Sequence, residues 1–297
     1  MTRRAILGLR WHDAEVALRV CAAAAPASTF EPLIGRTLEF RVVTPQPTHC
    51  LGRSGSGLYD CANRPTSVNR KCTPCSVADA AHASLLHHSH RRDGEPPQDG
   101  AVADHLAQPN VLYVAAFRDG SLKIGTSNAE RAITRLAEQG AWMAVLVAEA
   151  VNGYLVRIVE DAVTKVVGLP QSVSMVRKLQ GFERPLDDAL LRVRLNEATR
   201  RIHQLIEGTD GVSAIEQPWR FDHSDRWERV VRYPADLAVG AHELTILAVC
   251  GRVVLARIPG DDGAADSFVA DLGRLYGHEL EWGRFGTPTL TVQGALF

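Results

Sequence analysis

Four cysteines, Cys50, Cys61, Cys72 and Cys75, lie in a stretch of Gly, Ser, Pro and Asn residues with almost no apolar periodicity. Residues 49–76 therefore cannot build a hydrophobic core by themselves, and a bound metal ion would supply the missing stability. Four thiolates around a tetrahedral zinc ion make a closed structural site, to which the Cys72–Cys75 pair contributes one knuckle. The sequence therefore predicts a structural Zn²⁺ site at these four cysteines.

Other interpretations of the cysteines stay open. His49 could replace Cys50 as a ligand, and Cys72-Thr73-Pro74-Cys75 could have a redox role, although no thioredoxin-like pattern surrounds it. Four unrelated thiols are a third alternative, but this polar stretch offers little apolar surface to bury them. Cys21 and Cys250 lie among apolar residues and are predicted to belong to the core.

The composition is that of an ordinary soluble protein, with 45% hydrophobic and 23% charged residues and a net charge of −1. Such a chain would bind nucleic acid through a local basic patch rather than a general positive field. The start, Thr2–Leu7, resembles a twin-arginine export signal, but Arg10, His12 and Arg19 interrupt the apolar stretch that this signal needs. No apolar window reaches membrane-spanning length. We therefore expect a cytoplasmic protein that does not bind membranes.

The clearest secondary-structure pattern lies at about residues 109–165. It predicts two strands joined by the Asp119-Gly120 turn, then a helix capped by Ser127 or Asn128, then a strand and a second helix after the Asn152-Gly153 turn. The predicted elements are strands Val111–Phe117, Leu122–Gly125 and Trp142–Ala150, a helix to Ala137 that ends before Gly140, and a helix Leu155–Val167. The order is therefore β-β-α-β-α, within an α+β fold.

Around this module we expect a strand-containing N-terminal region (1–48), a zinc-binding cysteine region and linker (49–108), and a C-terminal β-rich α+β region (208–297). The module with its following helix occupies 109–207. The elements predicted outside the module are a strand at Leu38–Val43, a helix at Leu186–Glu207, a hairpin at Leu244–Ile258, a helix at Asp266–Tyr276 and a strand at Thr289–Val292.

Two segments of the module carry a resemblance. Val111-Leu112-Tyr113 and Lys123-Ile124-Gly125-Thr126 resemble the paired strands of the GIY-YIG nuclease superfamily, in an outlying branch with lysine in the second strand. Arg135, or Arg131 on the same helix, matches the superfamily's arginine, and Glu160 in Arg157–Glu160 matches its metal-binding glutamate. A closer resemblance, over about residues 50–165, is to an uncharacterised cysteine-containing domain family of archaea and actinobacteria, through Lys123–Thr126 and Leu136–Ala141.

The resemblance implies a metal-dependent phosphodiesterase that acts on DNA or RNA. Glu160 would hold Mg²⁺ or Mn²⁺, Arg135 would bind the phosphate in bidentate fashion, and Tyr113 would orient or deprotonate the attacking water. Lys123 replaces the second-strand tyrosine and would bind phosphate or act as a base. The superfamily's later asparagine is missing, and Ser172 or Ser174 could stand in. A non-catalytic nucleic-acid-binding protein and a scaffold repurposed for small-molecule chemistry are the alternatives.

Structural interpretations compete at each of these positions. Tyr113 could be a core residue, Arg131 and Arg135 a solvated helix face, and Glu160 the ion-pair partner of Arg157 or Lys165. Two further groups are open to either interpretation. One is the histidine run His87, His88 and His90 with Arg91 and Arg92; the other is the aromatic residues Trp219, Phe221 and Trp227 among arginines 220, 226, 229 and 232, for which we favour an interface between domains over base stacking.

Overall fold

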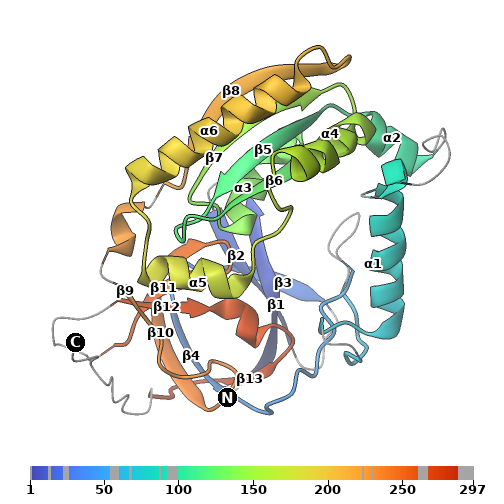
Figure 1. Cartoon of the computed structure of the whole chain (residues 1–297). Helices are drawn as coiled ribbons and strands as arrows, with labels where there is room; N and C mark the ends of the chain where they lie inside the picture. Colours follow the sequence, from blue (N-terminus) through green and yellow to red (C-terminus); the bar gives the residue numbers. More distant parts are fainter. Residues whose placement is uncertain are drawn as a thin grey trace. The chain divides into compact units, whose positions relative to one another are not determined.

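The computed structural model describes residues 2–12, 15–22, 27–53, 60–66, 69–86, 88–91, 100–222, 224–228, 230–259 and 267–286 (Figure 1). The chain divides into two compact units. The split unit comprises Met1–Asp79 and Asp225–Phe297, and the central unit comprises Ala80–Ser224. Each unit contains a β-sheet and helical segments, which confirms the predicted α+β class. Among the described residues, no helix is long and apolar enough to cross a membrane.

The split unit is built on a nine-stranded sheet with the strand order β3-β2-β1-β13-β4-β10-β11-β12-β9. Neighbouring strands are antiparallel except β12 and β9. The strands are β1 (Thr2–His12), β2 (Glu15–Ala22), β3 (Ser28–Pro32), β4 (Thr37–Val42), β9 (Val230–Arg232), β10 (Ala241–Cys250), β11 (Val253–Arg257), β12 (Ser267–Asp271) and β13 (Glu279–Trp282). Their inward side chains, among them Leu18, Phe40 and Ile246, are fully buried and form the core of this unit.

Two predictions for the split unit are confirmed and one is wrong. The strand at Leu38–Val43 is β4, and the hairpin at Leu244–Ile258 is formed by β10 and β11. The helix predicted at Asp266–Tyr276 is instead strand β12 followed by the 3₁₀ turn η4 (Leu272–Leu275). Phe268, Val269 and Ala270 are buried in the sheet beside β11, so tertiary pairing overrides the local pattern. The strand predicted at Thr289–Val292 lies outside the described residues.

The central unit contains a four-stranded antiparallel sheet with the order β6-β5-β7-β8. Its strands are β5 (Asn110–Ala116), β6 (Leu122–Asn128), β7 (Met143–Ala150) and β8 (Val212–Arg220). The predicted turn between β5 and β6 is present, and Gly120 adopts a φ of 85° there. Tyr113 lies opposite Gly125 and Ala115 opposite Lys123, so these four residues share one face of the sheet.

The helices of the central unit cover both faces of that sheet. The helices α4 (Gly153–Val166) and α6 (Asp188–Ile206) contact each other and pack on one face (Figure 1). On the other face, α3 (Ala132–Gln139) packs Ala132 and Leu136 against Tyr113 and Ala115. The remaining helical segments are α1 (Thr73–Leu86), η1 (Ser89–Arg91), α2 (Ala101–Ala107), η2 (Ala129–Arg131), α5 (Met175–Glu183) and η3 (Ser224–Trp227). The residues of α1 and η3 fall on both sides of the division between the units.

The observed order β5-β6-α3-β7-α4 matches the predicted β-β-α-β-α order. The helix caps explain the boundaries. Asn128 accepts a hydrogen bond from the Glu130 backbone N–H and starts a 3₁₀ turn that leads into α3. Gly140 ends α3 in the left-handed conformation, and Asn152 caps α4. The predicted helix at Leu186–Glu207 is α6, capped by Asp187.

Candidate functional site

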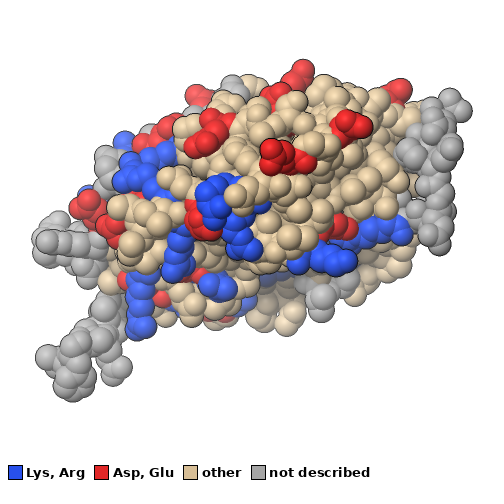
Figure 2. Space-filling view, turned by 45° about the horizontal axis from the view of Figure 1, so that its top comes forward, with Lys and Arg blue, Asp and Glu red and all other residues tan. Residues whose placement is uncertain are grey.

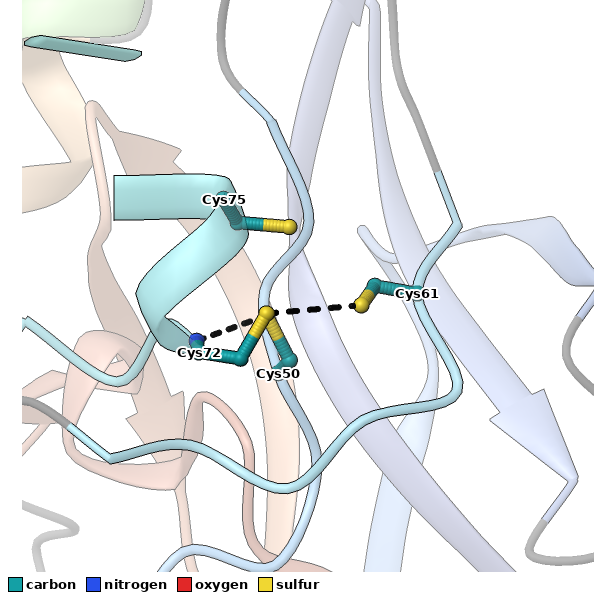
Figure 3. Close-up of side chains that lie close together, drawn as sticks. All are labelled: Cys50, Cys61, Cys72 and Cys75. Carbon is teal, nitrogen blue, oxygen red and sulfur yellow. Dashed lines mark hydrogen bonds between the residues drawn. The ribbon is translucent and has the colours of Figure 1, made fainter. Parts of the chain in front are cut away.

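The four predicted cysteines converge in the split unit. Their sulfur atoms all lie within 4.8 Å of one another, and the Cys61 and Cys72 sulfurs are 3.7 Å apart (Figure 3). Thiolates about 2.3 Å from a tetrahedral zinc ion lie about 3.8 Å from one another. The cluster therefore has the spacing of a closed tetrahedral metal site, and four cysteine sulfurs are the donor set that suits a soft or borderline divalent ion.

Backbone and amide N–H groups surround the sulfurs. Cys72 and Gly52 donate their backbone N–H groups to the Cys50 sulfur at 3.2 and 3.4 Å. The Asn63 side chain donates to the Cys72 sulfur at 3.6 Å. Cys72 directly precedes helix α1, on whose first turn Cys75 lies (Figure 3). These donors stabilise negative charge on sulfur, as the outer shell of a thiolate metal site does.

The thiols of the cluster differ in their pKa values. The backbone N–H of Cys75 and the Asn63 amide lower the pKa of Cys72 to about 6. Burial raises the pKa of Cys75, and the neighbouring thiols raise it further. Burial also raises the pKa of Cys50. One thiolate is therefore favoured without a metal, and a cation is needed to hold several negative sulfurs together.

The loops that carry the cysteines are tied to the sheet of the split unit. Arg70, with a left-handed φ of 63°, donates to the carbonyl oxygens of Gly273 at 2.6 Å and Tyr276 at 2.7 Å. Arg19 on β2 is 3% exposed and forms an ion pair with Asp60 at 2.6 Å. The cysteine loops are thus anchored at two points, although they lack a large apolar core of their own.

The positions of His49, Cys21 and Cys250 bear on the alternatives at the cysteines. His49 does not belong to the cluster of potential ligands among the described residues; its Nδ1 lies 2.9 Å from the Thr48 hydroxyl. Cys21 and Cys250 are buried away from the cluster, as predicted for core cysteines. Because Cys72 and Cys75 lie with two further thiols, a metal site explains the whole group better than a single redox pair does.

In the central unit, Tyr113 on β5 is 1% exposed and belongs to the core cluster beneath α3. Its hydroxyl oxygen accepts a hydrogen bond of 2.5 Å from Nε2 of Gln139, at the end of α3. Burial raises the pKa of Tyr113, although the Gln139 hydrogen bond and the charge of Arg135 oppose the shift. The phenol therefore stays protonated near neutral pH and can donate its proton in a hydrogen bond.

Lys123 on β6 is 8% exposed, and its Nζ lies 5.6 Å from the centre of the Tyr113 ring. The ammonium donates to the Gln171 carbonyl oxygen at 3.3 Å. Burial lowers the pKa of Lys123 to about 8, and the positive charges of Arg135 and Lys178 lower it further. An anion placed beside this amine would relieve both effects.

Arg135 on α3 is half-exposed, and its positive charge lowers the pKa of Tyr113. Its guanidinium also lies 3.4 Å from Glu138, which pairs more closely with Arg131 at 2.9 Å. Arg131 is two-thirds exposed, so it fits the interpretation as a solvated helix face. Of the two arginines, Arg135 is the one whose charge acts on Tyr113.

Glu160 on α4 is 5% exposed and pairs with Arg157 at 2.9 Å rather than with Lys165. Its negative charge raises the pKa of both Tyr113 and Lys123, so it lies within electrostatic range of both. Apart from the four cysteines, the described residues contain no group of three or more His, Cys, Asp or Glu side chains placed to surround an ion. A cation at Glu160 would therefore need further ligands from a substrate and water.

We call Tyr113, Lys123, Arg135, Glu160 and Arg157 the phenol cluster. Sequence reasoning missed two residues beside it. Lys178 on α5 donates to the Gln139 carbonyl oxygen at 2.7 Å, lies 4.4 Å above the Phe117 ring and acts electrostatically on Lys123. Gln139 bonds Tyr113 directly. Gln139 lies in a sequence segment that carries the family resemblance, whereas no local pattern marks Lys178.

Asp161 follows Glu160 on α4 and forms hydrogen bonds with part of the histidine run. His90 and Gln171 contact its carboxylate at 2.9 and 2.8 Å, and Arg91 donates to both of its oxygens. The Arg91 guanidinium holds the pKa of Asp161 well below its usual range. His90 and Arg91 are thus part of a packed network, while His88 is exposed and His87 and Arg92 lie outside the described residues.

The other candidate residues named from the sequence pack in or against the core or cap a helix. Phe221 and Trp227 are buried, and Trp219 packs against the core cluster of the central unit. This burial favours packing over base stacking, and Arg229 lies outside the described residues. Ser174 caps α5 by accepting a hydrogen bond from the Arg177 backbone N–H. Among the described residues drawn in Figure 2, basic side chains form separate groups with acidic and neutral side chains between them.

Residues 35–238 match the protein family described as "Protein of unknown function (DUF2797)". The match covers more than half of the chain and includes both the cysteine cluster and the phenol cluster. No curated protein and no solved structure matches the chain.

Proposed function

Because the chain belongs to the DUF2797 family, we propose its function from its own residues: the phenol cluster binds the phosphodiester backbone of DNA or RNA, and the four cysteines hold a structural zinc ion. One observation supports the binding role most. Lys123 is buried with its charge destabilised by Arg135, Lys178 and Arg157, and Glu160 is the carboxylate that opposes this repulsion. A phosphate group carries negative charge, which would offset the repulsion among these cations.

Each residue of the phenol cluster would contact the phosphate through a different chemical group. Arg135 is half-exposed and offers paired N–H donors that match two phosphate oxygens. Lys123 supplies a compact charge, and the protonated Tyr113 hydroxyl donates a single hydrogen bond. The net charge of −1 means that attraction is local, so affinity should fall with salt only as strongly as a few phosphate contacts require.

Hydrolysis at the same cluster is the second candidate function, and Glu160 is the observation that favours it. A carboxylate with 5% exposure is costly to bury, and Glu160 pairs with Arg157 while its charge acts on Tyr113 and Lys123. A Mg²⁺ or Mn²⁺ ion shared by Glu160 and a phosphate would stabilise the charge that develops on the phosphate oxygens. For this, Arg157 must turn away from Glu160, to which it is paired at 2.9 Å.

In that reaction the chain's own residues have distinct roles. Tyr113 keeps its proton because burial raises its pKa, so it orients a water or phosphate oxygen and does not act as the base. Lys123, with a pKa of about 8, is partly neutral near pH 8 and is the residue that can accept a proton from water. Arg135 stabilises the phosphate in the transition state.

Cleavage of labelled single- and double-stranded DNA and RNA with Mg²⁺ or Mn²⁺ tests this candidate. We expect Glu160→Gln to abolish cleavage while nucleic-acid binding remains within about threefold of wild type. Arg200→Gln is the matched control, because Arg200 is an exposed helix arginine paired with Glu197. Cleavage by wild type that is unchanged in Glu160→Gln would exclude catalysis at this cluster. Binding without cleavage under either metal would leave the binding role alone.

The zinc proposal rests on the sulfur spacing and on the poor core of the cysteine loops. Zinc prefers the tetrahedral four-thiolate set, and structural sites of this type leave no open coordination position for chemistry. The ion would therefore hold the loops together and take no part in phosphodiester cleavage.

A further inference from the structure

A cavity of about 540 Å³ in the central unit lies beside the turn between β5 and β6. Gly120, Leu122, Pro170, Val173, Arg177 and Arg194 are among the residues that line it, and we call it the turn pocket. Its volume falls within the range of small-molecule sites, about 300–1,000 Å³. None of the residues of the phenol cluster lines it, so it is a separate place on the same unit.

Two arginines give the turn pocket its charge. Arg177 on α5 forms an ion pair with Asp119 through its Nε at 2.8 Å. Arg194 on α6 donates its Nη1 to the Gly120 carbonyl oxygen at 2.9 Å, and no described carboxylate pairs with it. Two guanidinium groups are therefore balanced by one carboxylate, which leaves the pocket with a positive charge.

The same bonds hold both arginines in place and leave donors open. The contact of Arg177 with Asp119 uses Nε, and that of Arg194 with Gly120 uses Nη1, so each guanidinium keeps further N–H groups. Gly120 makes room for this arrangement, because a Cβ there would lie 2.8 Å from Nη1 of Arg194. A positioned guanidinium loses less conformational entropy when it binds an anion than a free one does.

Hydroxyl groups and apolar side chains complete the lining. Ser172 and Ser174 also line the pocket, and Ser174 caps helix α5, whose first N–H groups favour negative charge nearby. Leu122, Leu169, Pro170 and Val173 supply an apolar wall on which a flat or aliphatic body can pack. The lining therefore combines an anion-binding end with an apolar part.

We propose that the turn pocket binds a phosphate group attached to an apolar or aromatic body, as in a nucleotide. The planar fork of an arginine matches two phosphate oxygens, and two such forks suit a phosphate better than a carboxylate. The phosphate could belong to a free nucleotide or to a nucleic-acid strand, and the two sources share this chemistry. The proposal does not depend on binding or cleavage at the phenol cluster.

Calorimetric titration of the full chain with AMP, with adenosine and with a short single-stranded oligonucleotide tests the proposal. We expect AMP or the oligonucleotide to bind at least tenfold more weakly to Arg194→Gln and to Arg177→Gln than to wild type. Adenosine, which lacks the phosphate, should bind weakly to all three. Arg192→Gln is the matched control, since Arg192 is exposed on the same helix and does not line the pocket.

The source of the phosphate is identified by the probe whose binding is weakened in the pocket variants. AMP binding that requires Arg194 indicates a free nucleotide, and oligonucleotide binding alone indicates a strand. Comparison with Arg135→Gln separates the two sites, because AMP binding that depends on Arg135 and not on Arg194 belongs to the phenol cluster and contradicts the proposal. No binding of either probe by wild type, or equal affinities in wild type and in the folded Arg177→Gln and Arg194→Gln variants, would overturn the proposal.

Discussion

The hydroxyl oxygen of Tyr113 lies against the backbone of Gly125, its partner across the β5–β6 pair: a Cβ at Gly125 would lie only 2.4 Å from it. The glycine therefore makes room for the buried phenol, whose hydroxyl bonds Gln139 at 2.5 Å. Any larger residue at position 125 must displace the ring from the face it shares with Lys123. The position of the Tyr113 ring in the phenol cluster therefore requires a glycine at position 125.

Replacing that glycine should destabilise the central unit. Gly125→Ala inserts a methyl group into a packed core and is expected to lower the free energy of unfolding by about 1–3 kcal/mol. Urea denaturation followed by tryptophan fluorescence measures the change. Gly286→Ala is the control, because nothing lies within 4 Å of a Cβ there. Equal stability of wild type and Gly125→Ala would show that the ring can move at no cost.

The cysteine cluster should bind one zinc ion per chain. Elemental analysis of purified protein is expected to give one equivalent of zinc, and Cys75→Ser should lose most of it. Cys250→Ala should keep the ion, because Cys250 is buried outside the cluster. A chelator should lower the melting temperature by about 5 °C or more, since the cysteine loops have little core of their own. A full zinc content in Cys75→Ser would refute the assignment.

The buried Lys123 should make stability depend on pH. Its pKa in the folded protein is about 8, below the ordinary value of 10.5. Between these values the unfolded chain binds the proton and the folded chain does not, so stability rises as the pH rises through this window. Below pH 8 the full penalty applies, up to about 3 kcal/mol.

The comparison with Lys123→Met isolates this effect. The variant should gain stability relative to wild type at pH 7, and the gain should shrink by pH 10.5. Urea unfolding of both proteins at the two pH values measures it, because other titrating groups contribute equally to both. A stability difference that does not change with pH would mean that the amine titrates normally in the folded state.

The sequence was informative where local signals decide the structure. The turn at Gly120, the caps at Asn128 and Asn152 and the apolar runs predicted the order of β5, β6, α3, β7 and α4. The cysteine cluster followed from a polar stretch that could not otherwise be stable. Each of these features acts over a few residues, so a single sequence contains enough to find it.

Long-range pairing was much harder to predict. Strand β1 carries Arg3, Arg4 and Arg10, and it is stable as a strand because β2 and β13, far apart in sequence, pair with its two edges. Arg4 bonds Glu31 at 2.5 Å and lies 4.9 Å above the Trp282 ring, contacts with no local signal. Strand β12 was mistaken for a helix for the same reason.

The candidate sites likewise contain some contacts that follow from local sequence and others that depend on long-range packing. Tyr113 and Lys123 lie on neighbouring strands, so their proximity followed from a predicted hairpin, whereas Lys178 comes from a later helix that no pattern linked to them. The pairing of Glu160 with Arg157 was one of two local alternatives, and only the helix geometry decided it. The relationship to GIY-YIG nucleases remains a prediction from residues 111–160.

Binding of labelled DNA and RNA by fluorescence anisotropy, in wild type, Arg135→Gln and the matched control Arg200→Gln, tests the central claim most directly. If the phenol cluster binds the phosphodiester backbone, Arg135→Gln should weaken binding by about tenfold or more and reduce its salt dependence, because a charge-assisted phosphate contact is lost. Arg200→Gln should bind as wild type does. Equal affinities for all three proteins, or no binding by wild type at low salt, would contradict the account.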